Sequence, residues 1–220
     1  MKDYSVFDII GPIMVGPSSS HTAGAVRIGL VAHSLIQGDI SEVEITLYGS
    51  FAETGRGHGT DRAIIAGVLG VKPDDERIKY SMLLAKSENM KVTVHYSADE
   101  CEHPNTAKIR VTGENGRSYT VVGVSTGGGN IEIREIDGME VSFSGKYPTL
   151  IVFYPDAPGV ISKVTTVLAA MRINVAFMKV FRNAKRKRAC MVIETDAAVN
   201  NEVLEGIKSY VDEIEEICSL

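Results

Sequence analysis

The stretch GPSSSHTAGAVRIGLVAHSLI, residues 16–36, decides how the first half of the chain folds. From Ser20 to Ile36 the apolar side chains are spread over most faces, which predicts a helix that is buried on nearly every side. The next segment, Glu42 to Tyr48, alternates between apolar side chains and charged or polar ones, which is the period of a half-buried strand. A buried helix followed by such a strand indicates a mixed α/β arrangement.

Further helices and one loop are predicted after this strand. Gly49 to Gly59 holds four glycines and is predicted to be a loop. Thr60 to Leu69 is predicted to be a short apolar helix, because Thr60 and Asp61 suit an N-cap and a first-turn acid. A third helix is predicted over residues 76–86.

After residue 90 the apolar period changes to two, which indicates strands. Asn115-Gly116 and Asp137-Gly138 are hairpin dipeptides, so the strands that they join are expected to form an antiparallel meander. The predicted strands are residues 92–94, 107–112, 119–125, 131–136 and 139–143.

Residues 149–220 have their own order of elements, βαββαβ, which is that of a ferredoxin-like unit. The fold class is therefore predicted as α+β, with an N-terminal mixed α/β domain (1–145), a linker around Ser144–Pro148 and a ferredoxin-like domain (148–220). Lys185–Arg188 is interpreted as a solvated basic turn. The predicted elements are strand 150–154, helix 160–171, strands 175–181 and 189–194, helix 199–210 and strand 214–218.

The composition excludes several classes of protein. The 220-residue chain has a formal net charge of −5, which is a poor match for the basic surface that nucleic acid binding requires. No apolar run is long enough to predict a membrane-spanning helix, and the N-terminus lacks the core and cleavage site of a signal peptide, so a cytoplasmic location is expected. Cys101, Cys190 and Cys218 lie far apart without CxxC spacing, which favours reduced thiols over a self-contained metal or cluster site. Cys101 with His103 leaves metal ligands missing, so a self-sufficient metal enzyme is rejected.

The serine turn, Gly16–Thr22, is the first candidate site. Proline and serine suit a helix start, but three serines, a histidine and a threonine exceed what capping needs. Amides at a helix start with hydroxyls beside them suit a carboxylate or phosphate, so an ordinary cap and an anion site both stay open.

Two glycine-rich segments are further candidates. His58 lies between Gly57 and Gly59, where close approach of a ligand is possible and a histidine could move a proton, although a plain surface histidine is the alternative. Ser125–Asn130 places three glycines between strands and is either a flexible turn or a ligand-lining loop. It is not a dinucleotide fingerprint, because a strand follows it instead of a helix.

Together these motifs resemble one family. GPSSSHT, LYGSFAETGRGHGTD (Leu47–Asp61) and STGGGN (Ser125–Asn130) are similar to the beta chain of bacterial iron–sulfur L-serine dehydratases, and the likeness covers essentially the whole chain. The second half, with YPDAPGVI (Tyr154–Ile161) and MRINVAFM (Met171–Met178), resembles an ACT domain, a module that commonly binds small effectors between paired copies.

The resemblance implies a lyase that converts L-serine to pyruvate and ammonia. A [4Fe–4S] cluster would act on the serine hydroxyl as a Lewis acid, and its ligands would belong to a larger alpha subunit, with none in this chain. His58 is the implied general base, and Asp61 would orient it or bind substrate. The implied substrate-binding residues are Ser18, Ser19, Ser20, His21, Thr22, Asp61, Gly128 and Asn130.

In the ACT half, the resemblance makes Asp156, Gly159 and Asn174 the candidate effector-binding residues, with plain turn chemistry as the alternative. The effector would be an amino acid or a monovalent cation such as potassium. ACT domains usually pair edge to edge, so a homodimer is expected in addition to the alpha subunit.

The alternative function is a non-catalytic module that senses an amino acid or a hydroxy acid. The first domain also resembles a substrate-binding domain of some D-3-phosphoglycerate dehydrogenases, and a shared fold does not imply catalysis. A sensor needs no base, so His58 separates the two hypotheses. The choice of His58 or His21 as the base, of serine or threonine as substrate, and the stoichiometry with the alpha subunit stay open.

Overall fold

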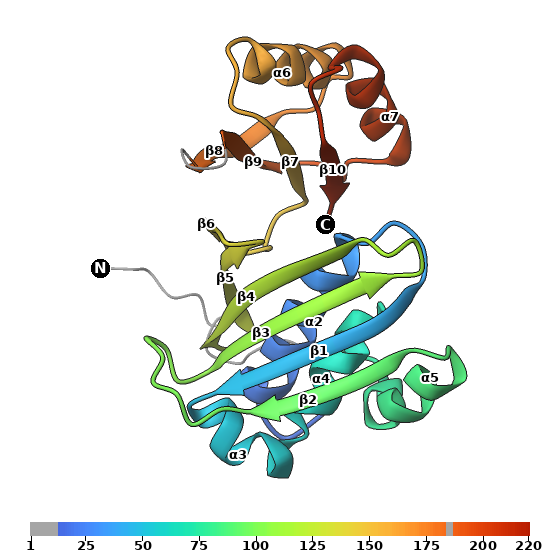
Figure 1. The fold of residues 1–220 in the computed structure, drawn as a ribbon, viewed down its shortest axis with the longest axis vertical. Coiled ribbons are helices and arrows are strands. Elements are labelled where there is room, and N and C mark those ends of the chain that lie inside the picture. Colours follow the sequence, from blue (N-terminus) through green and yellow to red (C-terminus); the bar gives the residue numbers. More distant parts are fainter. Residues whose placement is uncertain (1–12, 184–186) are drawn as a thin grey trace. The chain divides into compact units, whose positions relative to one another are not determined.

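The computed structural model describes residues 13–183 and 187–220 of the chain. They fall into two compact units that divide after Gly138, at the predicted Asp137-Gly138 turn, and each combines a sheet with helices (Figure 1). Within the described ranges, no helix is both long enough and apolar enough to cross a membrane.

The first sheet has six strands in the order β2-β1-β3-β4-β5-β6. β1 pairs parallel with β2 and antiparallel with β3, and β3 to β5 continue as the predicted meander. The strands are β1 Ile40–Tyr48, β2 Lys91–Tyr96, β3 Thr106–Gly113, β4 Ser118–Gly127, β5 Asn130–Ile136 and β6 Met139–Phe143.

Helices α2 and α4 lie against one face of this sheet, where α2 contacts β3, β4 and β5 and α4 contacts β1 (Figure 1). The predicted buried helix is confirmed, and it begins with a short π-helix, η1. The helices of this unit are η1 Ser19–Gly24, α2 Ala25–Ser34, α3 Ser50–His58, α4 Thr60–Val68, η2 (a 3₁₀ helix) Glu76–Tyr80 and α5 Ser81–Ser87.

Helices α2 and α4 cross with their backbones in contact. A Cβ on Gly67 would lie 2.1 Å from the Val26 carbonyl oxygen, and a Cβ on Gly29 would lie 2.3 Å from the Ile64 carbonyl oxygen. Real Cβ atoms do not approach backbone this closely, so only glycine fits on either side of the crossing. The two helices are therefore packed at a fixed position along each other.

Helix α2 is also fixed against the sheet, where small residues of β4 face it. A Cβ on Gly123 would lie 2.8 Å from Ile28 Cγ2, and a Cβ on Gly24 would lie 2.2 Å from Ser125 Oγ. Close packing on two sides leaves α2 little freedom to shift. Its N-terminal turn therefore has a defined position.

The prediction of a loop over residues 49–59 is wrong, because Ser50–His58 form helix α3. Gly49 has φ +52°, and a Cβ on it would lie 2.7 Å from the Pro104 carbonyl oxygen, so this glycine turns the chain out of β1. Gly59 is left-handed, with φ +70°, which ends α3 and lets α4 begin at the next residue.

One of the two glycines inside α3, Gly55, has a packing reason. A Cβ on Gly55 would lie 3.2 Å from Thr60 Cβ, so the small residue lets α3 approach the start of α4. On the same helix, the fully buried Phe51 ring holds α3 on the core. Tertiary packing thus overrides the low helix propensity of the glycines.

From Thr149 on, the second unit has the predicted βαββαβ order, and its sheet order β10-β7-β9-β8 is ferredoxin-like, so the predicted α+β fold class is confirmed. Both helices cover one face of the sheet and share one apolar core with it. The predicted basic turn at residues 185–188 lies partly outside the described residues. The elements are β7 Thr149–Pro155, α6 Val160–Ala170, β8 Val175–Asn183, β9 Arg188–Thr195, α7 Asn201–Tyr210 and β10 Glu216–Ser219.

The helix crossing predicts a stability difference between two glycines. We expect Gly67→Ala to lower the free energy of unfolding by about 1–3 kcal/mol, because its Cβ must displace backbone of α2. Gly57→Ala, which has open space around its Cβ, should leave stability unchanged or raise it by up to about 1 kcal/mol. Urea unfolding of both variants measures this, and equal effects would contradict the role given to the crossing.

Candidate active site

The serine turn is built as the N-cap of the buried helix. Ser18 has an extended backbone (φ −141°, ψ 124°), and its Oγ accepts a hydrogen bond from the His21 backbone N–H at 3.1 Å. Ser19–Gly24 then continue as the π-helix η1, a rare geometry that is frequently found at functional sites. Within it, His21 and Thr22 are buried.

The His21 ring lies between the serine turn and α3. Its Nδ1 is 3.1 Å from Ser20 Oγ, and its Nε2 is 3.1 Å from Thr54 Oγ1 and 3.3 Å from Ser50 Oγ. The Phe51 ring packs edge-on against it, with centroids 5.1 Å apart. Both ring nitrogens are engaged, so the ring ties the serine turn to α3.

The Thr54 hydroxyl sets the direction of these hydrogen bonds. Thr54 Oγ1 lies 2.8 Å from the Ser50 carbonyl oxygen, which can only accept, so Thr54 donates its proton there. Thr54 Oγ1 therefore accepts from His21 Nε2–H, and His21 Nδ1 accepts from the Ser20 hydroxyl. The Nε2–H tautomer of His21 is assigned from this network.

Burial keeps His21 in its neutral form. Burial lowers the pKa of His21, hydrogen bonding to Ser50 raises it, and the neighbouring His58 lowers it further, with a net shift below the ordinary value. Since that ordinary value is about 6.5, the neutral form of His21 predominates at pH 7.

His58 is exposed at the end of α3, and its ring centroid is 4.9 Å from that of His21. His58 Nδ1 lies 3.1 Å from the Thr54 carbonyl oxygen, so Nδ1–H donates to that oxygen. In the neutral ring, Nε2 is then the nitrogen with the lone pair. The arrangement can therefore accept a proton at a defined atom, next to a buried neutral histidine.

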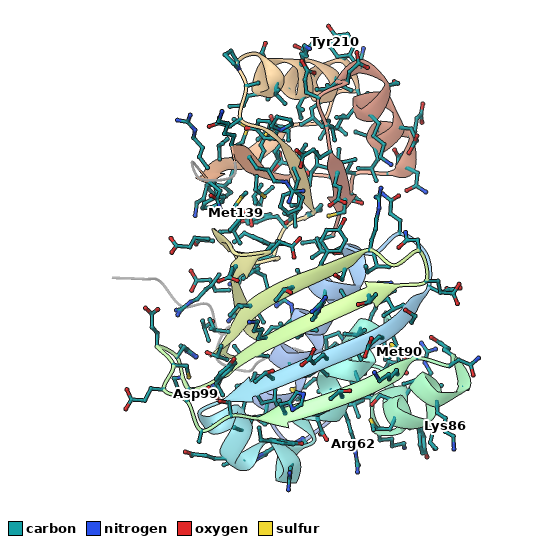
Figure 2. The ribbon with its side chains drawn as sticks, viewed as in Figure 1. Arg62, Lys86, Met90, Asp99, Met139 and Tyr210 are labelled. Carbon is teal, nitrogen blue, oxygen red and sulfur yellow. The ribbon has the colours of Figure 1, made fainter. Side chains whose placement is uncertain are left out.

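Asp61, in the first turn of α4, has other partners than the two histidines. Asp61 Oδ1 accepts from the Arg62 backbone N–H at 2.9 Å, and Oδ2 accepts from the Tyr96 hydroxyl at 3.4 Å. Tyr96 in turn lies under the Arg56 guanidinium, 4.3 Å from ring centroid to Cζ. Arg62, labelled in Figure 2, is exposed in the first turn of α4. The bond that orients His58 comes from Thr54, not from Asp61.

The three-glycine loop joins β4 to β5. Gly127, Gly128 and Gly129 have φ values of +95°, +60° and +76°, which side chains rarely adopt. Asn130 Nδ2 donates to the Gly127 carbonyl at 3.2 Å, and Arg27 Nη1 donates to the Gly129 carbonyl at 2.9 Å, so the loop is tied to α2. The strands on both sides of the loop contact η1.

Two buried hydroxyls near the serine turn, Thr22 Oγ1 and Ser125 Oγ, have no hydrogen-bond partner among the described residues. Thr22 packs on Gly16, where a Cβ would lie 2.7 Å from Thr22 Cγ2, and Ser125 packs on Gly24. The predicted substrate-binding residue Thr22 therefore packs against Gly16 of its own turn and has a hydroxyl without a partner in the described part of the chain.

The candidate effector residues do not meet within one chain. Asp156 follows the end of β7 that pairs with Arg188, and its carboxylate forms an ion pair with Arg182 at 2.6 Å. Asn174 precedes the end of β8 that pairs with Thr195, and its Nδ2 donates to Asp196 at 2.6 Å. Because β9 runs from Arg188 to Thr195, the two residues lie at opposite ends of the sheet. Between them in sequence, left-handed Gly159 (φ +94°) begins α6.

In the described part of the chain, no three metal-ligating side chains of the His, Cys, Asp or Glu type come together. Burial raises the pKa of the Cys190 thiol to about 12 and also raises that of Cys218, so neither favours the thiolate form that a metal needs. Cys101 Sγ donates to the His103 carbonyl at 3.0 Å. These thiols do not form a set of ligands for a cluster.

Ser50 and Thr54 are site residues that the sequence reasoning missed. Ser50, Thr54 and His58 are spaced by four, so they lie on one face of α3 once that segment is known to be a helix. The four-residue spacing was the available signal, and the prediction of a loop concealed it.

The fold and the site define a two-domain α+β protein with a paired-histidine, candidate acid–base site in the first domain. Residues 5–135 match the family model described as serine dehydratase beta chain, and residues 148–212 match the ACT domain. The chain therefore belongs to the serine dehydratase beta chain family, as the sequence motifs predicted.

Similar proteins include the probable L-serine dehydratase, beta chain, of Bacillus subtilis (strain 168), 45% identical over 207 residues that cover 94% of each chain. The L-serine dehydratase, beta chain, of Peptoniphilus asaccharolyticus is 41% identical over 212 residues, 96% of this chain and 94% of that one. D-3-phosphoglycerate dehydrogenase of Methanocaldococcus jannaschii is 29% identical over 188 residues, 84% of this chain and 34% of that protein.

The lowered pKa of His21 predicts a pH-dependent stability. Unfolded His21 binds a proton near pH 6.5, whereas the folded ring does so only at lower pH. This difference leaves the free energy of unfolding unchanged above about pH 7.5 and lowers it as the pH drops through 6.5. One such group contributes a slope of at most about 1.4 kcal/mol per pH unit.

We expect His21→Gln to reduce the slope of the free energy of unfolding against pH between pH 7 and 5 by the contribution of this one group. Urea unfolding at a series of pH values measures this. The pKa of His103 is also lowered, mainly by burial, so a smaller slope should remain. His95→Gln, in the exposed part of β2, is the matched control. If His21→Gln and the control keep the same slope, the buried neutral state assigned to His21 is wrong.

Proposed function

We propose that the chain is the beta subunit of a cytoplasmic, [4Fe–4S]-dependent L-serine dehydratase that converts L-serine to pyruvate and ammonia. The observation that carries the proposal is the hydrogen bond from His58 Nδ1 to the Thr54 carbonyl, because it leaves Nε2 as a proton acceptor beside the serine turn. The names of the relatives that are 45% and 41% identical support the same reaction.

In the proposed reaction, His58 Nε2 takes the α-proton of L-serine, and the hydroxyl group leaves the β-carbon. That proton and the leaving hydroxide together make water, and the aminoacrylate product hydrolyses to pyruvate and ammonia. His58 is favoured over His21 as the base, because both nitrogens of His21 are occupied by Ser20, Ser50 and Thr54.

Substrate would be held at the serine turn and the three-glycine loop. Helix-start amides with adjacent hydroxyls suit the serine carboxylate, and Ser18 and Ser20 are already oriented by hydrogen bonds. The proposed substrate contacts are Ser18, Ser19, Ser20, His21, Thr22, Asp61, Gly128 and Asn130.

The cluster would be held by an alpha subunit, which shares the active site with this chain. The described thiols of the chain do not fit a cluster, since burial raises the pKa values of the Cys190 and Cys218 thiols and no three His, Cys, Asp or Glu side chains come together in the described ranges. The contribution proposed for this chain is a base and a substrate-binding surface.

The ACT unit would bind an amino acid or potassium. Asp156 and Asn174 lie at opposite ends of the sheet, so a site that uses both needs a second copy of the chain. This geometry supports the proposed homodimer, in which Gly159 would let an effector approach the start of α6.

A non-catalytic sensor of an amino acid or a hydroxy acid is the second candidate. The observation that favours it is the match with 34% of a D-3-phosphoglycerate dehydrogenase, since that similarity places the same two-unit segment in a different enzyme. A sensor would not need the oriented His58 ring, because it removes no proton from its ligand.

We expect pyruvate to form from L-serine only when the chain is mixed anaerobically with a cluster-loaded alpha subunit. His58→Ala should lower kcat by roughly 10²–10⁴-fold, because a general base is removed, while the complex still forms in gel filtration. His95→Ala should leave kcat within about twofold of the wild type, because His95 lies in the strand β2 and not in the histidine pair.

No pyruvate from a cluster-loaded mixture would overturn the dehydratase proposal and favour the sensor. Full activity of His58→Ala would keep the enzyme and remove His58 as its base.

A further inference from the structure

Thr54 contacts both histidines through different oxygen atoms. Its Oγ1 lies 3.1 Å from His21 Nε2, and its carbonyl oxygen lies 3.1 Å from His58 Nδ1. Thr54 is exposed, so core packing does not account for a threonine at this position. One residue in the middle of α3 therefore connects the two rings.

The hydrogen bonds around His21 form a directed chain. The His21 backbone N–H donates to Ser18 Oγ at 3.1 Å, Ser18 donates to Ser20 Oγ at 3.2 Å, and Ser20 donates to His21 Nδ1 at 3.1 Å. On the other side, His21 Nε2–H donates to Thr54 Oγ1, which donates to the Ser50 carbonyl at 2.8 Å.

Backbone groups close this chain at both ends. An amide N–H does not release its proton near neutral pH, and a carbonyl oxygen has none to give. The two backbone ends therefore fix the direction of the hydrogen bonds along the chain, and Ser50 Oγ adds a further contact at 3.3 Å from His21 Nε2. Such a chain is suited to orienting the His21 ring.

We propose that Thr54 is a positioning residue of the active site: its hydroxyl holds His21 against α3, and its carbonyl directs the His58 ring. The consequence for catalysis rests on the proposed function of His58 as base. The neutral His21 ring then packs beside the base, since its ring centroid is 4.9 Å from that of His58. Its other aromatic contact is the buried Phe51.

Threonine suits this role better than serine or valine. Its branched Cβ restricts χ1, and in helices its Oγ1 commonly bonds the carbonyl four residues earlier, as Thr54 does with Ser50. Serine keeps the oxygen but loses the restriction, and valine keeps the shape but loses the oxygen. The pair Thr54→Ser and Thr54→Val thus separates hydrogen bonding from packing.

Histidine tautomers in the full 23.8 kDa chain, read from long-range ¹H–¹⁵N spectra of ¹⁵N-histidine-labelled protein, test the positioning without any enzymatic assay. We expect His21 as the Nε2–H tautomer and His58 as the Nδ1–H tautomer in the wild type. Thr54→Val should shift His21 to a mixture of tautomers, whereas Thr54→Ser should keep the wild-type pattern. Thr166→Val is the control, because Thr166 makes the same hydroxyl-to-carbonyl bond with Ser162 in helix α6, which belongs to the second unit.

Kinetics with the cluster-loaded alpha subunit test the consequence for catalysis. Thr54→Val should lower kcat roughly three- to tenfold with KM unchanged, which is the effect expected for the loss of one orienting hydrogen bond. Thr54→Ser should restore kcat to within about twofold of the wild type, and Thr166→Val should not change it.

The two arms distinguish the positioning proposal from the proposed function. Unchanged His21 tautomers in Thr54→Val, or a raised KM with unchanged kcat, would overturn the positioning role. If the wild-type chain mixed with the cluster-loaded alpha subunit forms no pyruvate, the dehydratase function is overturned. The tautomer spectra would still decide whether Thr54 sets the ring orientations.

Discussion

The backbone contact between Gly29 and Gly67 is the constraint on which the first unit depends. Because a Cβ on either glycine would collide with a carbonyl oxygen of the facing helix, α2 and α4 approach this closely only with glycine at both positions. Gly123 fixes the other side of α2 by admitting Ile28 against β4. In a close-packed interior a change in volume of even one methylene group is felt. A helix that is packed on two sides therefore keeps one position along its axis. The His21 turn at its start is placed by the same contacts.

The fixed position of α4 carries over to α3, because only Gly59 separates the two helices. Gly55 brings α3 close to Thr60 at the start of α4, and the buried Phe51 closes the contact from the side of the core. The two histidines thus come from elements that are each anchored by glycine contacts elsewhere. Their 4.9 Å separation follows from helix packing and needs no direct hydrogen bond between the rings.

Periodic segments were predictable from the sequence because their period reports the local environment directly: the alternation of Glu42–Tyr48 gave β1, and the βαββαβ order gave the second unit. The helix α3 was not predictable in this way. Gly49 is needed for its contact with Pro104, which is distant in the chain, and Gly55 for its contact with Thr60, which is visible only in three dimensions. The motif around His58 was found, but its partner Thr54 was missed, since four-residue spacing has meaning only on a helix. The distance between Asp156 and Asn174 was also not predictable, because it depends on the strand directions. These place the two residues at opposite ends of the sheet.

The neutrality of His21 is a condition for basicity at His58, given the proposed function. If both rings were charged at 4.9 Å, their repulsion would be roughly 1–3 kcal/mol for effective dielectric constants between water and a protein surface. Burial of His21 removes this penalty, because the ring beside the base carries no charge when the proton arrives. A buried ring next to an exposed one thus allows two histidines to stand side by side while a single one takes up a proton.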